Sequence, residues 1–134
     1  MPKYNDPIKE ARRYVANAKE LLRNNTKVEG DKYDDEKYVR MAGDTAWKGC
    51  LIALESVFSV KADKGEERVK INNYKDAVSK RDKKLLGLLI EGYNFLHLYM
   101  GYDGSSDTYI VKKGLNLAKE LIDKCENMRP KAKA

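Results

Sequence analysis

The single histidine of the chain, His97, is the residue best suited to acid–base chemistry. A histidine can act as a general base near neutral pH, and Glu91 and Asn94, within two helical turns before it, could orient its ring. No nucleophile occurs at a spacing that would pair with it. We therefore favour an imidazole at the edge of the core with one hydrogen bond, and we assign no catalytic residue.

Four tyrosines cluster around this histidine in the sequence, at positions 93, 99, 102 and 109. Tyrosine suits half-buried surfaces and interfaces, because its ring is apolar and its tip is polar. Such rings can also stack on bases, but proteins that bind single strands usually add a basic groove. The local charged residues are instead Glu91, Asp103 and Asp107. The candidate binding residues are Tyr93, His97, Tyr99 and Tyr102.

The other reactive groups in the sequence indicate structural roles rather than catalytic or ligand-binding roles. Cys50 and Cys125 lie on predicted apolar faces, so we expect buried, reduced thiols, although a disulfide is possible in principle. Two cysteines and one histidine are too few for a structural metal site. Residues 101–106 (GYDGSS) match no phosphate-loop pattern and predict a turn before a helix. The sequence therefore predicts no metal and no cofactor.

The charge of the chain permits contact with nucleic acid without requiring it. The 134 residues carry a net charge of +6, but basic and acidic residues are interspersed outside two short runs at 80–84 and 129–134. The most apolar run, residues 85–100, is too short to span a membrane and contains polar residues. We expect a cytoplasmic protein with no membrane contact, for which a nucleic-acid partner is possible but not favoured.

The segment 34–60 predicts a central helix with two apolar stripes. One stripe is rich in small residues such as Gly43 and Gly49, which would let another helix approach closely. The second stripe is bulky and consists of Trp47, Leu51, Leu54 and Phe58. Since a helix with two apolar faces needs two sets of partners, we expect the bulky stripe to be a candidate interface in a homodimer.

Other amphipathic segments complete an all-α architecture. Asp6 and Pro7 predict a helix start, and the first helix should end at Asn24 or Asn25. Asn72 could cap a short third helix. Residues 85–100 predict a fourth helix, either continuous with the third or separate from it, and residues 107–128 predict the last. The sequence thus predicts one domain, 1–134, an antiparallel bundle of four long helices plus one short helix. Its ends, 1–5 and 129–134, are expected to be flexible.

Segments 8–22 (IKEARRYVANAKELL) and 38–58 (YVRMAGDTAWKGCLIALESVF) resemble the opening helix pair of the HEPN superfamily, and 115–122 (LNLAKELI) is similar to its closing helix. These are small bacterial and archaeal helical bundles, many of them dimers. Ribonuclease members carry an arginine four to six residues before a histidine, but 90–93 hold no arginine before His97. The resemblance therefore implies a non-catalytic member, similar to binding subunits beside nucleotidyltransferases.

Three hypotheses for the function follow. The first is a non-enzymatic helical module that self-associates and has a possible protein partner. The second is a nucleic-acid-associated HEPN-like protein, either a degenerate ribonuclease or the partner subunit of a nucleotidyltransferase or toxin. The third, a small enzyme that uses His97 as a base, has the least support from the spacing of residues.

Overall fold

Residues 4–129 are described by a computed structural model, which is an all-α bundle. The long helices are α1 (Pro7–Asn25), α2 (Glu36–Glu55), α4 (Lys83–Gly92) with the π-helix η1 (Tyr93–Tyr102) that continues it, and α5 (Thr108–Met128). The short helix is α3 (Ile71–Ser79), and strands β1 (Val28–Glu29) and β2 (Lys32–Tyr33) form a hairpin between α1 and α2. The predicted bundle of four long helices and one short helix is confirmed.

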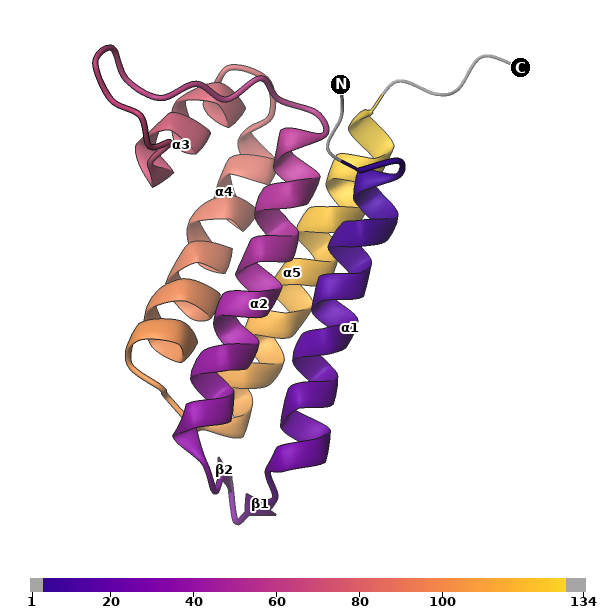
Figure 1. The fold of residues 1–134 in the computed structure, drawn as a ribbon, viewed down its shortest axis with the longest axis vertical. Helices are drawn as coiled ribbons and strands as arrows, with labels where there is room; N and C mark the ends of the chain where they lie inside the picture. The colour runs from indigo at the N-terminus through magenta and orange to yellow at the C-terminus, as the bar shows by residue number, and fades with distance from the viewer. Residues whose placement is uncertain (1–3, 130–134) are drawn as a thin grey trace.

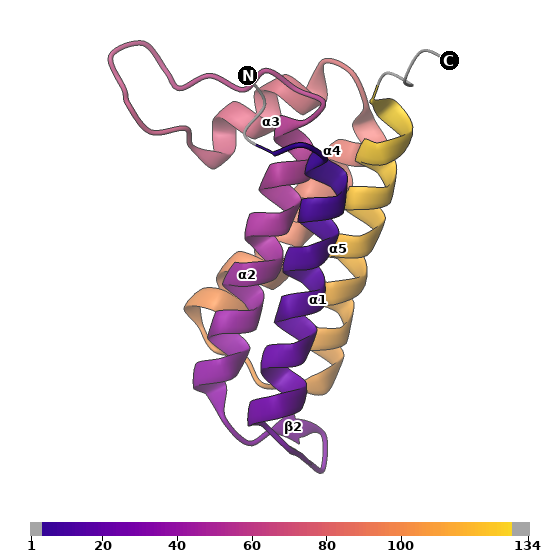
Figure 2. The ribbon, with the colours of Figure 1, turned by 45° about the vertical axis from the view of Figure 1, so that its right-hand side comes forward.

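Successive long helices run in opposite directions (Figure 1). α1 begins and α5 ends at one end of the bundle, whereas the hairpin lies at the opposite end. α3 lies across the first end, and the segment 56–70 loops out beside it before the chain enters α3 (Figure 2). The hairpin was not predicted, because each of its strands has two residues, which is too short to show an apolar alternation.

Side-chain caps fix where the helices begin. The Asp6 carboxylate accepts a hydrogen bond from the Lys9 N–H at 3.2 Å, with Pro7 in the first turn, as predicted. The Asp82 carboxylate accepts from the Leu85 N–H at 2.9 Å, so α3 and α4 are separate helices. The predicted cap at Asn72 is wrong, because the N-cap of α3 is Lys70, two residues earlier, and Asn72 lies inside the helix.

The small residues of α2 meet two different neighbours. A Cβ atom at Gly49 would lie 2.7 Å from the Ala11 carbonyl oxygen of α1. A Cβ atom at Gly43 would lie 2.5 Å from the Leu96 carbonyl oxygen of η1. Both distances are shorter than carbon–oxygen contact allows, so only glycine lets these backbones approach so closely. The predicted close approach of helices at this stripe is confirmed.

α2 ends at Glu55, five residues before the predicted end at residue 60. The Ser56 hydroxyl donates to the Ala53 carbonyl at 2.6 Å, which gives the backbone an alternative to continued helix. The chain then turns so that Phe58 packs into the core. The segment 61–70, which is charged and has no apolar periodicity in the sequence, contains neither helix nor strand.

Ion pairs join the first and last helices. The Arg12 guanidinium lies 2.8 Å from the Asp123 carboxylate and 3.0 Å from that of Glu126, and Arg129 lies 3.2 Å from Asp6. Tyr4 packs partly buried against the core. The rest of the predicted flexible ends, 1–3 and 130–134, lies outside the described residues. Within 4–129, no helix is long and apolar enough to cross a membrane.

Candidate functional site

A groove opens between α2, η1 and α3, where aromatic side chains from distant parts of the chain meet. Its volume is about 400 Å3. The lining residues are Trp47, Leu51, Arg68, Val69, Lys70, Ile71, Tyr74, Tyr93 and His97. Small-molecule sites in proteins commonly measure about 300–1,000 Å3 and combine apolar walls with a few polar groups, so the groove has a suitable size and composition.

Three rings form one continuous aromatic series along the groove. The Tyr93 and His97 rings are stacked, with centroids 5.1 Å apart and an interplanar angle of 30°. Trp47 meets the Tyr93 ring edge-on, with centroids 5.7 Å apart. The His97 side chain remains 44% exposed, and its Nδ1 lies 3.7 Å from the Asp44 carboxylate. Trp47 is thus the buried end of the series, and His97 is its solvent-exposed end.

The backbone of η1 positions the tyrosine and the histidine. Its hydrogen bonds reach one residue further than those of an α-helix, as from the Asp103 N–H to the Leu98 carbonyl at 2.8 Å. π-helical segments are rare and occur frequently at functional sites. Glycines flank the contact with α2, since a Cβ atom at Gly92 would meet the Trp47 ring at 3.6 Å and one at Gly101 would collide with Asp44. The widened helix therefore lies directly against α2.

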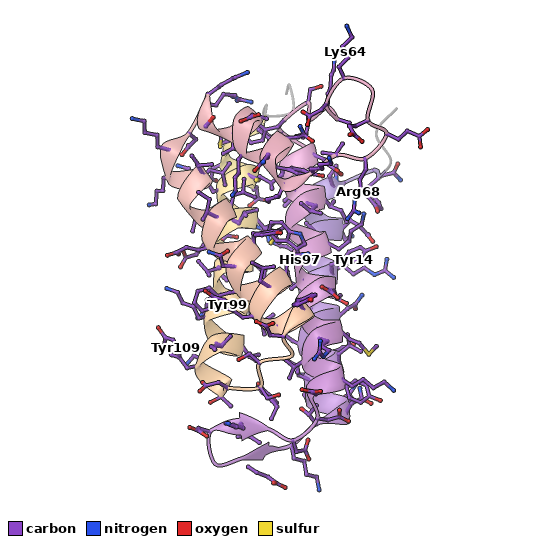
Figure 3. The ribbon with its side chains drawn as sticks, turned by 90° about the vertical axis from the view of Figure 1, so that its left-hand side faces the viewer. Tyr14, Lys64, Arg68, His97, Tyr99 and Tyr109 are labelled. Carbon is purple, nitrogen blue, oxygen red and sulfur yellow. The ribbon has the colours of Figure 1, made fainter. Side chains whose placement is uncertain are left out.

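The other wall comes from the loop before α3 and from α3 itself. Arg68 and Lys70 contribute the cations of this wall, and Figure 3 shows Arg68 on the same face of the molecule as His97. Lys70 lies 3.8 Å from the exposed Glu66 carboxylate. Arg68 makes no ion pair or hydrogen bond within residues 4–129, so its guanidinium is free to meet an anion.

Tyr74 of α3 lines the groove and is held in place by a hydrogen bond. Its hydroxyl donates a hydrogen bond to the Glu55 carboxylate at 2.7 Å. Burial, reinforced by this hydrogen bond, raises the pKa of Tyr74 well above its usual range, so the phenol stays protonated. No acidic residue lines the groove itself, and its formal charge is therefore positive.

The groove lacks the partners of a familiar catalytic arrangement. Neither serine, threonine nor cysteine lines it, so His97 has no hydroxyl or thiol there to activate. In the described part of the chain, no group of three histidine, cysteine or acidic side chains could hold a metal ion. The groove offers aromatic rings, two cations and apolar surface.

Comparison with known proteins places the chain in a family. Residues 6–127 match the family described as a domain of unknown function, DUF5618. The chain belongs to this family. A solved structure of a protein of unknown function from Dyadobacter fermentans is 40% identical, with a TM-score of 0.82, over 90% of this chain and 94% of that one. No curated protein matches.

These matches name neither an activity nor a partner for the DUF5618 chain. The function of the Dyadobacter protein is likewise unknown. The resemblance to the HEPN superfamily therefore stays a prediction. The site has to be judged from its own geometry.

The predicted interface stripe is not an exposed stripe in this DUF5618 protein. Trp47, Leu54 and Phe58 are only 7%, 0% and 5% exposed, and Leu51 is half-buried. The expectation that a second copy covers this stripe is therefore corrected, because the chain itself covers it. Tyr93 packs on Trp47, and the Arg81 guanidinium lies 5.0 Å from the centre of the Phe58 ring.

The structure divides the predicted binding residues between two places. Tyr93 and His97 lie in the groove together with Trp47 and Leu51, two residues that the sequence had assigned to a different role. Tyr99 packs edge-on against Phe95 outside the groove, and Tyr102 is largely exposed with its carbonyl accepting a hydrogen bond from Arg40. The four residues therefore do not form one site.

Sequence reasoning missed the cationic wall and Tyr74. Arg68 and Lys70 belong to a charged segment without periodicity, which predicts an exposed loop but not where that loop folds. Tyr74 falls within the predicted short third helix, but nothing in the sequence indicates that it lines a groove. The one signal in the sequence is that residues 68–71 (RVKI) contain no acid, whereas 61–67 (KADKGEE) contain three.

Proposed function

We propose that this protein is a non-enzymatic interaction module that recognises a partner through the groove of Trp47, Tyr93 and His97. The observation that carries the proposal is the aromatic series beside an unpaired arginine, assembled from α2, η1 and the loop before α3. Rings beside a cation are typical of recognition, because they combine apolar contact with directional polar contact. The absence of a nucleophile beside His97 in the groove supports a binding role over a catalytic one.

Native mass spectrometry of protein purified gently from the organism that makes it tests this proposal. We expect a bound partner, either a small molecule or a second protein, as extra mass on the wild-type chain. The variant Arg68→Glu should lose that mass, because it reverses the charge at the rim of the groove. Lys64→Glu reverses an equal charge on the same loop, further from His97, and should keep it (Figure 3). Retention of the partner by Arg68→Glu would contradict the proposal.

The same experiment separates the nucleic-acid alternative from the first proposal. An adduct that contains nucleotides would favour the HEPN-like role, as a degenerate ribonuclease or as the partner subunit of a nucleotidyltransferase or toxin. Affinity for mixed RNA should then fall steeply as salt increases, because binding to phosphates releases counterions. Aromatic rings beside Arg68 and Lys70 are the features that this alternative would use.

Self-association is a second candidate function, favoured by a separate observation. Ile90, Tyr99 and Tyr109 are large apolar side chains that remain 37%, 38% and 69% exposed. Figure 3 shows both tyrosines on the face that η1 and α5 present to solvent. Tyrosine is enriched in interfaces between proteins, so this face replaces the buried stripe as the proposed dimer contact.

Sedimentation over a range of protein concentrations tests the dimer. Alanine at both Tyr99 and Tyr109 should weaken dimerisation by about 2 kcal/mol or more, since aromatic anchors dominate interface energies. Alanine at Tyr102, which is 75% exposed and is not part of the proposed contact, is the control and should leave dimerisation unchanged. A wild-type chain that stays monomeric at high concentration, or a dimer that both substitutions leave unchanged, would remove this candidate.

A further inference from the structure

We propose that the ligand of the groove is a small planar aromatic oxyanion, that is, a flat ring system carrying a carboxylate or a phosphate. This inference rests on the proposed function, which leaves the nature of the partner open. It follows from three features of the groove: the character of its walls, the sign of its charge, and its size. Each of them excludes a class of ligand.

The aromatic side chains that line the groove favour a ligand with a flat ring. Tyr93 is covered by His97 on one side and by the edge of Trp47 on another, and the exposed end of this series is the His97 ring. A planar guest can extend the series by stacking or by edge-to-face contact, with ring centroids about 4.5–7 Å apart. Leu51, Val69 and Ile71 supply apolar surface around that position. A strongly hydrated, non-aromatic guest would forfeit these contacts.

The charge selects an anion. The guanidinium of Arg68 has no ion pair or hydrogen bond among the described residues, whereas three acids near the groove have partners of their own. Glu66 pairs with Lys70 at 3.8 Å, Glu55 accepts the Tyr74 hydroxyl at 2.7 Å, and Asp44 faces His97 at 3.7 Å. An arginine presents a planar fork of donors that matches the two oxygens of a carboxylate or phosphate. The groove therefore complements a negative group placed at its rim.

The volume limits the size of the guest. A space of about 400 Å3 lies near the lower end of the range for small-molecule sites. A fused two-ring system with one charged substituent fits within that volume, whereas a folded domain is far too large to enter it. The ring of the ligand would lie against the exposed His97 ring, and the anionic group toward Arg68.

A nuclear magnetic resonance titration of the full-length, 15N-labelled chain tests the inference. The chain has a single tryptophan, so the indole N–H signal of Trp47 reports on the groove without ambiguity. The probes are 2-naphthoate and 2-naphthyl phosphate, which carry ring and charge, 2-naphthylmethanol, which lacks the charge, and cyclohexanecarboxylate, which lacks the flat ring. We expect saturable shifts of the Trp47 signal with one or both of the first two, and about tenfold weaker binding of the others.

Matched variants assign the contacts. Arg68→Gln should weaken binding of the charged aromatic probe about fivefold or more, whereas Lys64→Gln removes the same charge from the same loop and should leave it unchanged. His97→Ala should weaken binding about tenfold, and His97→Phe, which restores a ring, should recover most of the affinity. Far-ultraviolet circular dichroism confirms that each variant is folded.

The inference is overturned if none of the probes shifts the Trp47 signal, if the uncharged or non-aromatic probe binds as tightly as the charged aromatic ones, or if Arg68→Gln and Lys64→Gln behave alike. Its failure is distinguishable from that of the proposed function. A partner seen by mass spectrometry and lost in Arg68→Glu would preserve the groove as a recognition site, even though its ligand is of another class. The stronger of the two anionic probes identifies the preferred charged group.

Discussion

Gly43 is the position at which a single added methyl group tests the packing of η1 on α2. A Cβ atom there would lie 2.5 Å from the Leu96 carbonyl oxygen, 2.6 Å from the Met100 Cβ atom and 2.9 Å from the Gly101 nitrogen. Two of these three atoms belong to the backbone, so no change of side-chain rotamer relieves the overlap. Gly43→Ala must push the two helices apart or bend one of them.

Two opposing effects set the size of the loss. Alanine is favoured over glycine inside a helix by about 1 kcal/mol. Overpacking of a tight contact costs about 1–3 kcal/mol, and the upper end applies where backbone atoms block the methyl group. The free energy of unfolding should therefore fall by about 2 kcal/mol in Gly43→Ala. For a chain of this length, that corresponds to a decrease in Tm of roughly 8 °C.

Gly87 offers the same substitution without the contact. It lies within α4, is exposed, and a Cβ atom there would meet nothing within 4 Å. Gly87→Ala should raise the free energy of unfolding by about 0.5–1 kcal/mol, because alanine restricts the unfolded chain. Urea unfolding followed by circular dichroism measures both variants. If Gly43→Ala were as stable as Gly87→Ala, the close approach of η1 to α2 would be refuted.

Three further predictions concern the core, the ion pairs and the thiols. Trp47→Ala should lower the free energy of unfolding by about 3–5 kcal/mol in urea unfolding, because the ring is only 7% exposed, and should leave the oligomeric state unchanged. Hydrogen bonds from Lys119 and then Arg12 lower the pKa of Asp123, so their stabilisation is present at neutral pH and is lost as pH falls through that lowered pKa. Arg12→Met should therefore lose less stability on acidification than the wild type, as measured by urea midpoints at several pH values. Burial raises the pKa of both cysteine thiols, that of Cys125 to about 12, so a thiol reagent such as Ellman's should react only after unfolding.

The number and order of the helices could be predicted because local rules agreed with the global fold. Asp6 and Pro7 form a start signal that needs no tertiary context, and the polar and glycine-containing breaks fell between the helices. The small-residue stripe of α2 was also predictable, since only small side chains permit close helix contacts. These features depend on residues near one another in the sequence.

The site could not be predicted, because its parts are brought together by tertiary structure. The wheel of α2 showed that Trp47 lies on an apolar face, but not that Tyr93 of the same chain covers it. Periodicity indicates that a face is buried and is silent about what buries it. For the same reason, no sequence pattern indicates that Arg68 and His97 line one groove, since α3 and α4 separate them in the chain.

The π-helical hydrogen bonding of η1 could not be predicted from the sequence either. The apolar positions of 85–100 fit an α-helix well, because an apolar face is compatible with a small change in the number of residues per turn. The register depends instead on backbone hydrogen bonds such as that from the Asp103 N–H to the Leu98 carbonyl. The close contact with Gly43 constrains the backbone of this segment, and no local sequence pattern indicates that constraint.

Because η1 both packs on Gly43 and carries His97, the packing of the core and the shape of the groove should be linked. The Leu96 carbonyl that would meet a methyl group at position 43 belongs to the residue directly before His97. A displacement of η1 should therefore alter the stacking of His97 on Tyr93 and the edge contact of Tyr93 with Trp47. Gly43→Ala should shift the Trp47 indole N–H signal in the folded protein, whereas Gly87→Ala should leave it in place. Identical Trp47 signals in wild type and Gly43→Ala would show that the groove is independent of this contact.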